Sequence, residues 1–215
     1  MFEKQRANRA AQRHERALSK WQADRDELAD LVQTARMFRG IPSSQIMLRT
    51  GEAVFYVVTG AALIEERRRA GQWHGRSSGV SVPLGPLRYR VGRSRGHFVQ
   101  GTPVPTAIDR GTLYITNQRV IFQGARQTRE CQFAKLIGFQ HSPRQGSTTF
   151  SVANRQKPTT FLYGRSLSGA IEFRLDLALA HFKGSVGDLV AGLSADLARL
   201  DGDRPSPPES ECPVS

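Results

Sequence analysis

Residues 111–124 read GTLYITNQRVIFQG, and this stretch decides how the rest of the chain is interpreted. Apolar residues alternate with other residues on both sides of the polar triplet Thr116-Asn117-Gln118. A period of two is typical of a strand with one buried face, and a short polar interruption between two such strands favours a tight turn. The stretch therefore predicts an antiparallel hairpin with the triplet at its turn.

Further short apolar runs surround this hairpin over residues 50–176, and Gly, Pro, Asn and Ser separate them. Between these runs, residues 71–96 are rich in loop-forming residues. Short strands spaced about ten residues apart indicate an antiparallel sandwich or a small barrel. The runs that we interpret as strands cover residues 53–64, 87–91, 131–139, 148–153, 159–163 and 171–175.

The beginning of the chain has a different composition, because residues 3–38 contain no Pro or Gly. This composition favours a long helix, and Gly40 and Pro42 end it. An apolar stripe with heptad-like spacing needs a partner, which is either a second copy of the chain in a coiled coil or the chain's own domain. The stripe consists of Leu18, Trp21, Leu28 and Val32.

Near the other end, apolar residues between Phe182 and Leu200 recur every three or four positions. This spacing predicts one amphipathic helix. Residues 201–215 contain four prolines and are predicted to form a disordered tail.

The 111–124 hairpin resembles the central hairpin of bacterial PH-like domains and of the related GRAM domains. The shared pattern is a glycine, an apolar strand ending in Thr-Asn, one variable residue, an arginine, and a strand ending in Phe. The residues that carry it are Gly111, Thr116, Asn117, Arg119 and Phe122. We interpret these residues as structural, because turn formation accounts for the polar ones.

The resemblance implies an α+β fold over residues 45–200. This fold is a PH-like, half-open antiparallel barrel of about seven strands with a C-terminal amphipathic capping helix. A long N-terminal helix, within an arm of residues 1–40, precedes it. The departure from the family pattern is an Arg/Gly/Ser-rich insertion at about residues 67–110.

The chain is strongly basic, with a net charge of +12 and an isoelectric point near 10.8. The excess is concentrated in residues 65–165, which carry 17 basic and 4 acidic groups. Arginine makes bidentate contacts with phosphate, so we interpret seven arginines of this region as candidate anion- or lipid-binding residues. The alternative is that they only form a solvated polar surface. The set consists of Arg67, Arg68, Arg69, Arg88, Arg90, Arg93 and Arg95.

No catalytic residues, metal ligands or cofactor are expected. The two cysteines, Cys131 and Cys212, are too few for a thiolate zinc site and are expected to be free thiols. The five histidines are dispersed. Residues 75–79, GRSSG, match a nucleophile pattern but lack the strand-to-helix context that it requires. We therefore expect a protein that is not an enzyme.

The sequence predicts a non-catalytic binding or adaptor module that contacts an anionic phospholipid surface or a protein partner through its basic central region. A nucleic-acid-binding protein that uses the same charge is the alternative. No apolar run is long enough for a transmembrane segment. We expect a cytoplasmic protein, peripheral at the inner face of the cell membrane, with homo-oligomer formation through the N-terminal helix as an option.

Overall fold

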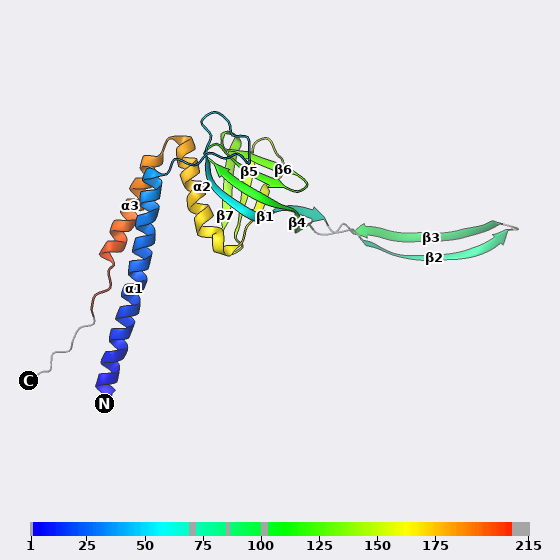
Figure 1. Cartoon of the computed structure of the whole chain (residues 1–215). Helices are drawn as coiled ribbons and strands as arrows, with labels where there is room; N and C mark the ends of the chain where they lie inside the picture. The colour runs from blue at the N-terminus through cyan, green and yellow to red at the C-terminus, as the bar shows by residue number, and fades with distance from the viewer. Residues whose placement is uncertain (1, 69–71, 85–86, 100–102, 208–215) are drawn as a thin grey trace, which may run out of the picture.

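The computed structural model describes residues 2–68, 72–84, 87–99 and 103–207. A long helix, α1 (Phe2–Met37), comes first, strands follow, and two helices, α2 (Ser168–Lys183) and α3 (Val186–Gly202), end the described chain (Figure 1). The strands are β1 (Val54–Arg68), β2 (Gln72–Leu84), β3 (Leu87–Val99), β4 (Pro103–Thr116), β5 (Arg119–Gly124), β6 (Thr128–Gln132), β7 (Leu136–Ser142), β8 (Ser147–Val152) and β9 (Thr159–Leu162).

Seven of these strands form one antiparallel sheet in the order β6-β5-β4-β1-β9-β8-β7. The first strand of the chain lies beside the last, because Leu63 of β1 pairs with Phe161 of β9. The sheet is not closed, since β6 and β7 remain its two edges. The α+β class and the open antiparallel sheet of seven strands are therefore confirmed.

The core lies between the sheet and α2. Phe122 and Phe161 are fully buried, and their rings stack with centroids 5.6 Å apart. On the helix side, Ile171 and Leu175 are buried against β1 and β4. The prediction that residues 171–175 form a strand is wrong: Ile171, Leu175 and Ala178 recur every three or four positions, so a helix puts all three on the face toward the sheet.

The prediction of one C-terminal amphipathic helix is also wrong, because the structure has two C-terminal helices, α2 and α3. Gly184 adopts a left-handed backbone with φ of +70°, and the Ser185 N–H donates to the Ala180 carbonyl over 2.9 Å. This left-handed glycine ends α2 and lets α3 begin in a new direction. Consequently α2, not the predicted stripe over residues 182–200, covers the sheet.

The N-terminal helix is confirmed, and its apolar stripe packs on the chain's own α3. The two helices run antiparallel: the Trp21 indole Nε1 donates to the Leu200 carbonyl over 2.7 Å, while Arg36 contacts Ser194. Val32 is buried, whereas Leu18, Trp21 and Leu28 are half-buried. Of the two partners considered for the stripe, the structure shows the intramolecular one.

Residues 72–84 and 87–99 form a two-stranded ribbon, so the expectation of a loop-rich stretch is wrong for these residues. Strands β2 and β3 pair through thirteen consecutive partners, from Gln72↔Val99 to Leu84↔Leu87. The ribbon follows β1, precedes β4 and extends away from the sheet (Figure 1). We refer to residues 72–84 and 87–99 as the ribbon.

The β4–β5 hairpin is held by the segment that precedes β1. Thr116 Oγ1 donates to Glu52 Oε1 over 2.7 Å, and Asn117 Oδ1 accepts the Ala53 N–H over 2.9 Å. Arg119 donates to both carboxylate oxygens of Glu52, over 2.8 and 2.9 Å. Gly111 lies so close to Gly124 that a β-carbon would sit 2.0 Å from the Gln123 carbonyl oxygen. The hairpin residues singled out by the sequence thus make contacts within the fold.

Of the predicted tail, residues 201 and 202 belong to the last turn of α3. Residues 208–215, which include Cys212, lie outside the described part of the chain.

Candidate functional site

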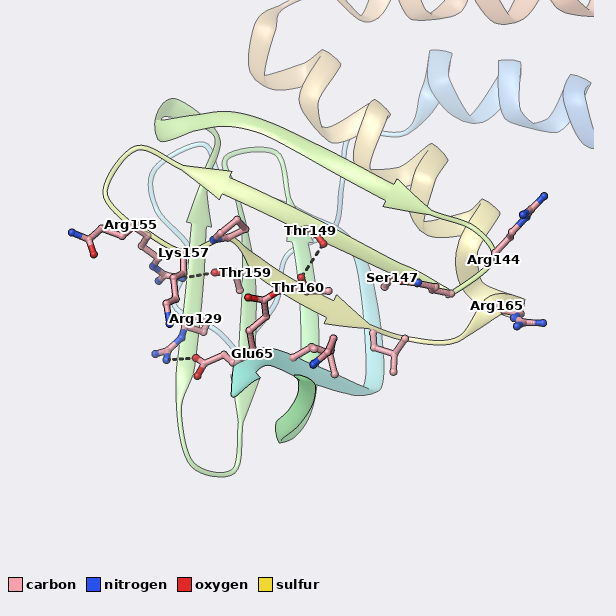
Figure 2. Close-up of a pocket in the computed structure, with 17 residues that line it drawn as sticks. Glu65, Arg129, Arg144, Ser147, Thr149, Arg155, Lys157, Thr159, Thr160 and Arg165 are labelled. Carbon is pink, nitrogen blue, oxygen red and sulfur yellow. Dashed lines mark hydrogen bonds and ion pairs between the residues drawn. The ribbon is translucent and has the colours of Figure 1, made fainter. Parts of the chain in front are cut away.

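A cavity of about 1140 Å³ lies against β1, β8 and β9. Its floor is on the face of the sheet opposite the core: Ile64, Thr149 and Thr160 line the cavity, while their neighbours Leu63, Phe150 and Phe161 are buried in the core. The Thr149 and Thr160 hydroxyls lie 2.8 Å apart across the β8–β9 pair (Figure 2). The floor therefore presents hydroxyls that can donate to or accept from a ligand, next to the apolar side chains of Ile64 and Leu162.

Arg144 and Arg165 stand at one end of this floor (Figure 2). They come together because the backbones of Gly146 and Gly164 touch: a β-carbon on Gly146 would lie 2.1 Å from the Gly164 carbonyl carbon. Gly146 also has φ of +65°, and its carbonyl accepts the N–H groups of Tyr163 and Gly164. Only glycine combines the left-handed backbone with this close approach. Local backbone geometry thus brings the β7–β8 turn, which carries Arg144, next to the segment after β9, which carries Arg165.

The opposite end carries Arg129 of β6 together with Arg155 and Lys157 of the β8–β9 loop (Figure 2). Arg129 Nη2 pairs with Glu65 Oε1 at 3.1 Å, and Arg155 Nη1 donates to Thr159 Oγ1 over 3.1 Å. These contacts fix two of the three cations at this end. The Glu65–Arg129 pair also links the end of β1 to the edge strand β6.

The electrostatic balance of the cavity is positive, since five cations face two carboxylates, Glu65 and Glu66. Among the described residues, Arg144, Lys157 and Arg165 have no ion-pair partner within 4.0 Å. Cations that have no ion-pair partner among the described residues and border a floor with hydroxyls are suited to an anionic ligand such as a phosphate group. We refer to this site as the basic cavity.

The arginines that the sequence singled out lie elsewhere. Arg67 is exposed near the end of β1, opposite Val104, and the next residue, Arg68, pairs with Pro103. Arg69 lies outside the described residues. The remaining four are positions of β3 in the ribbon: Arg88, Arg90, Arg93 and Arg95. The structure thus divides the basic region between a ribbon and a cavity that sequence reasoning missed.

A serine and a histidine meet beneath α2 in a way that invites comparison with a catalytic pair. Ser168 Oγ lies 2.8 Å from His141 Nε2, but Ser168 is only 5% exposed. The other ring nitrogen, Nδ1, faces the hydroxyls of Thr148 and Tyr163 at 3.0 and 2.9 Å rather than a carboxylate. A nucleophile must be reachable, and its base needs an orienting acid. The nearest carboxylate, Glu172, lies 3.6 Å from Nε2, the nitrogen that also faces Ser168, so it does not orient the imidazole through Nδ1. This network joins α2 to β7 and β8, and its serine is buried.

The described cysteine is also poorly suited to chemistry. Cys131 is buried, and this burial raises the pKa of its thiol to about 11. The thiol is therefore protonated at neutral pH, whereas the nucleophilic form is the thiolate. Within residues 2–68, 72–84, 87–99 and 103–207, no three His, Cys, Asp or Glu side chains gather as a metal site would require.

None of the helices in the described ranges has the length and apolar character needed to cross a bilayer. Comparisons with models of known protein families, with curated proteins and with solved structures found no match.

Proposed function

We propose that this chain is a non-catalytic, PH-like binding module, and that its basic cavity receives the phosphate of an anionic lipid headgroup at a membrane surface. The fold argument for the PH-like assignment is the open sheet of seven antiparallel strands with its first strand beside its last, followed by α2 packed on the core. The 111–124 hairpin adds the sequence resemblance.

One observation carries the functional part of the proposal. Arg144, Lys157 and Arg165 border the hydroxyl floor without an ion-pair partner in the described residues. A basic residue close to an anionic leaflet contributes about 1 kcal/mol of binding free energy. The three together give attachment that is measurable and, because it is electrostatic, sensitive to salt.

The test measures co-sedimentation with phosphatidylcholine vesicles that contain one-third phosphatidylglycerol. The triple variant Arg144→Gln/Lys157→Gln/Arg165→Gln should bind on the order of 100-fold more weakly than the wild type. The matched control is Arg6→Gln/Arg9→Gln/Arg16→Gln, which removes the same charge from exposed positions of α1. The control should retain most of the binding.

Equal losses in both triple variants would show that only net charge matters and would overturn the cavity as the site. A second arm titrates a DNA duplex. If the cavity variant loses duplex binding while vesicle binding is absent in the wild type, the ligand is nucleic acid and the lipid proposal is wrong.

A further inference from the structure

The cations of the basic cavity stand in two groups that are separated by the length of strand β8. Arg144 precedes this strand and Arg155 follows it. A strand rises about 3.4 Å per residue, so the six residues of β8 place about 17 Å between the two groups. Figure 2 shows Arg144 with Arg165 at one end of the β8–β9 hairpin and Arg155 with Lys157 at the other. We refer to the first pair as the turn end and to the second as the loop end.

The described residues that form the floor between the two ends are uncharged. On β8 and β9 they are Ser147, paired with Leu162, and Thr149, paired with Thr160. A continuous polyanion such as a nucleic-acid strand carries a charge at every nucleotide and would lay uncompensated phosphates along this stretch. Two separate anionic groups avoid this, because each of them meets the cations of one end.

The two ends differ in the carboxylates beside them. Ile64 of β1 lies opposite Thr160 of β9, and the strands are antiparallel, so the next residues of β1 approach the loop end. These residues are Glu65 and Glu66, the two carboxylates of the cavity. Glu65 pairs there with Arg129 at 3.1 Å. The carboxylates offset part of the positive charge of the loop end, so the turn end attracts an anion more strongly.

We propose that the basic cavity binds two anionic headgroups at once, from two separate lipid molecules of one membrane leaflet, and that the turn end holds its headgroup more tightly. Two phosphates joined by a single glycerol lie closer together than the length of β8, so one such lipid does not serve both ends. Both ends reach the surface together only when the β8–β9 hairpin lies parallel to the membrane. The inference rests on the proposed function and adds the number of lipids and this orientation.

The experiments use three double variants that each remove two positive charges. They are Arg144→Gln/Arg165→Gln at the turn end, Arg155→Gln/Lys157→Gln at the loop end, and Arg6→Gln/Arg9→Gln at exposed positions of α1 as the matched control. Thermal melting of each variant checks that the fold is intact.

The first test counts binding sites with a soluble lipid, dihexanoylphosphatidylglycerol, below its critical micelle concentration. Binding is followed through the backbone amide shifts in NMR spectra, with Gly164 reporting on the turn end and Gln156 on the loop end. The wild type and the α1 control should show shifts at both reporters. The turn-end variant should lose only the shift at Gly164, and the loop-end variant only the shift at Gln156.

The second test varies the mole fraction of phosphatidylglycerol in phosphatidylcholine vesicles. If one protein binds two lipids, the affinity of the wild type rises with about the second power of this fraction, and that of each one-end variant with about the first power. The α1 control should keep the steeper dependence, which separates a two-lipid site from a general response to surface charge. At one-third phosphatidylglycerol, we expect affinity losses on the order of 30-fold for the turn-end variant and 10-fold for the loop-end variant.

The outcomes separate this inference from the proposed function. If the wild type does not bind the vesicles, the proposed function fails. If it binds them but the soluble lipid shifts fewer than two reporters, or if either one-end variant abolishes both shifts, only the two-lipid inference is overturned. A first-power dependence in the wild type, or an equal loss of steepness in the α1 control, would overturn it as well.

Discussion

The β4–β5 hairpin and the ribbon are both two-stranded antiparallel units, yet they treat arginine in opposite ways. In the hairpin, Arg119 is 9% exposed and donates to both oxygens of Glu52, and it also lies 3.1 Å from Glu130. In the ribbon, five arginines occur in a stretch without a carboxylate. The hairpin therefore balances its arginine charge with carboxylates within the fold, whereas the ribbon contains no carboxylate of its own that could balance its arginines.

The comparison shows that residue type alone does not separate structural from binding arginines. What separates them is the presence of a carboxylate that the chain brings to the same place. Glu52 reaches Arg119 from 67 positions away along the chain.

The largest effect is expected from Glu52→Gln. The substitution removes the charge that balances Arg119 in a buried site, and breaking a buried pair in this way typically costs 3–5 kcal/mol. Glu130 still faces Arg119, so we expect a loss of about 3 kcal/mol in the free energy of unfolding, measured by urea denaturation. Glu65→Gln, which breaks the half-buried pair with Arg129, is the control and should cost about 1 kcal/mol, because both side chains of that pair still reach solvent. Similar losses in the two variants would contradict the contrast drawn here.

The next effect concerns the backbone of the same hairpin. In Gly111→Ala the new β-carbon meets the Gln123 carbonyl, so β4 and β5 must separate. Overpacking of this kind costs about 1–3 kcal/mol. Gly138→Ala on β7 is the matched control, because nothing lies within 4 Å of a β-carbon there. Thermal melting of the two variants should differ clearly, and equal melting temperatures would show that the hairpin backbone is more adaptable than described.

Acid should remove part of the Glu52 contribution. Burial alone would raise the pKa of Glu52, but hydrogen bonds from Arg119, the Arg49 N–H and Thr116 outweigh it and hold the pKa below its ordinary value of 4.5. A lowered pKa in the folded state means that the stabilisation is complete above pH 4.5 and is lost as the pH falls through the lower, folded value.

The measurement is the difference in unfolding free energy between the wild type and Glu52→Gln as a function of pH. This difference should narrow below pH 4.5. Burial raises the pKa of Asp176, which has the opposite sign, but that contribution is common to both proteins and cancels. If this difference in unfolding free energy stayed constant down to strongly acidic pH, the ionised carboxylate of Glu52 would not be the source of the stabilisation.

The smallest effect on stability is expected in the ribbon. Arg88→Gln/Arg90→Gln/Arg93→Gln/Arg95→Gln should change stability by less than about 0.5 kcal/mol per site, and vesicle binding should weaken at the same time. Calorimetric melting and vesicle co-sedimentation of the same preparation check both statements. A large melting loss would show that these arginines are structural, like Arg119.

The hairpin was predictable because its signals are local. Alternation around Thr116-Asn117-Gln118 specifies strand, turn and strand within fourteen residues, and the structure has β4 and β5 at these positions. The apolar run from Ile171 was misread because alternation of two or three residues is also part of a helical pattern. Only its continuation to Ala178 distinguishes the two.

The basic cavity was out of reach for a different reason. Its cations are spread from Arg129 to Arg165, and the contact between Gly146 and Gly164 is what joins two of them. The sequence predicts the strands on both sides of the 154–158 loop. It does not predict that the basic residues in this loop and those at the opposite end of the β8–β9 hairpin line the same cavity. The signal available was the occurrence of basic residues in successive turns, at Arg144, Arg155, Lys157 and Arg165.

The ribbon also has a consequence for the order in which the chain folds. Strand β1 must pair with β4 across the 34 residues that separate Arg68 from Pro103. If the ribbon forms first, which a local hairpin does within microseconds, only six residues remain between it and the two sheet strands. The entropy cost of closing that loop then falls by about 1.5 kcal/mol. Early formation of the ribbon would thus shorten the effective loop that must close before β1 can pair with β4.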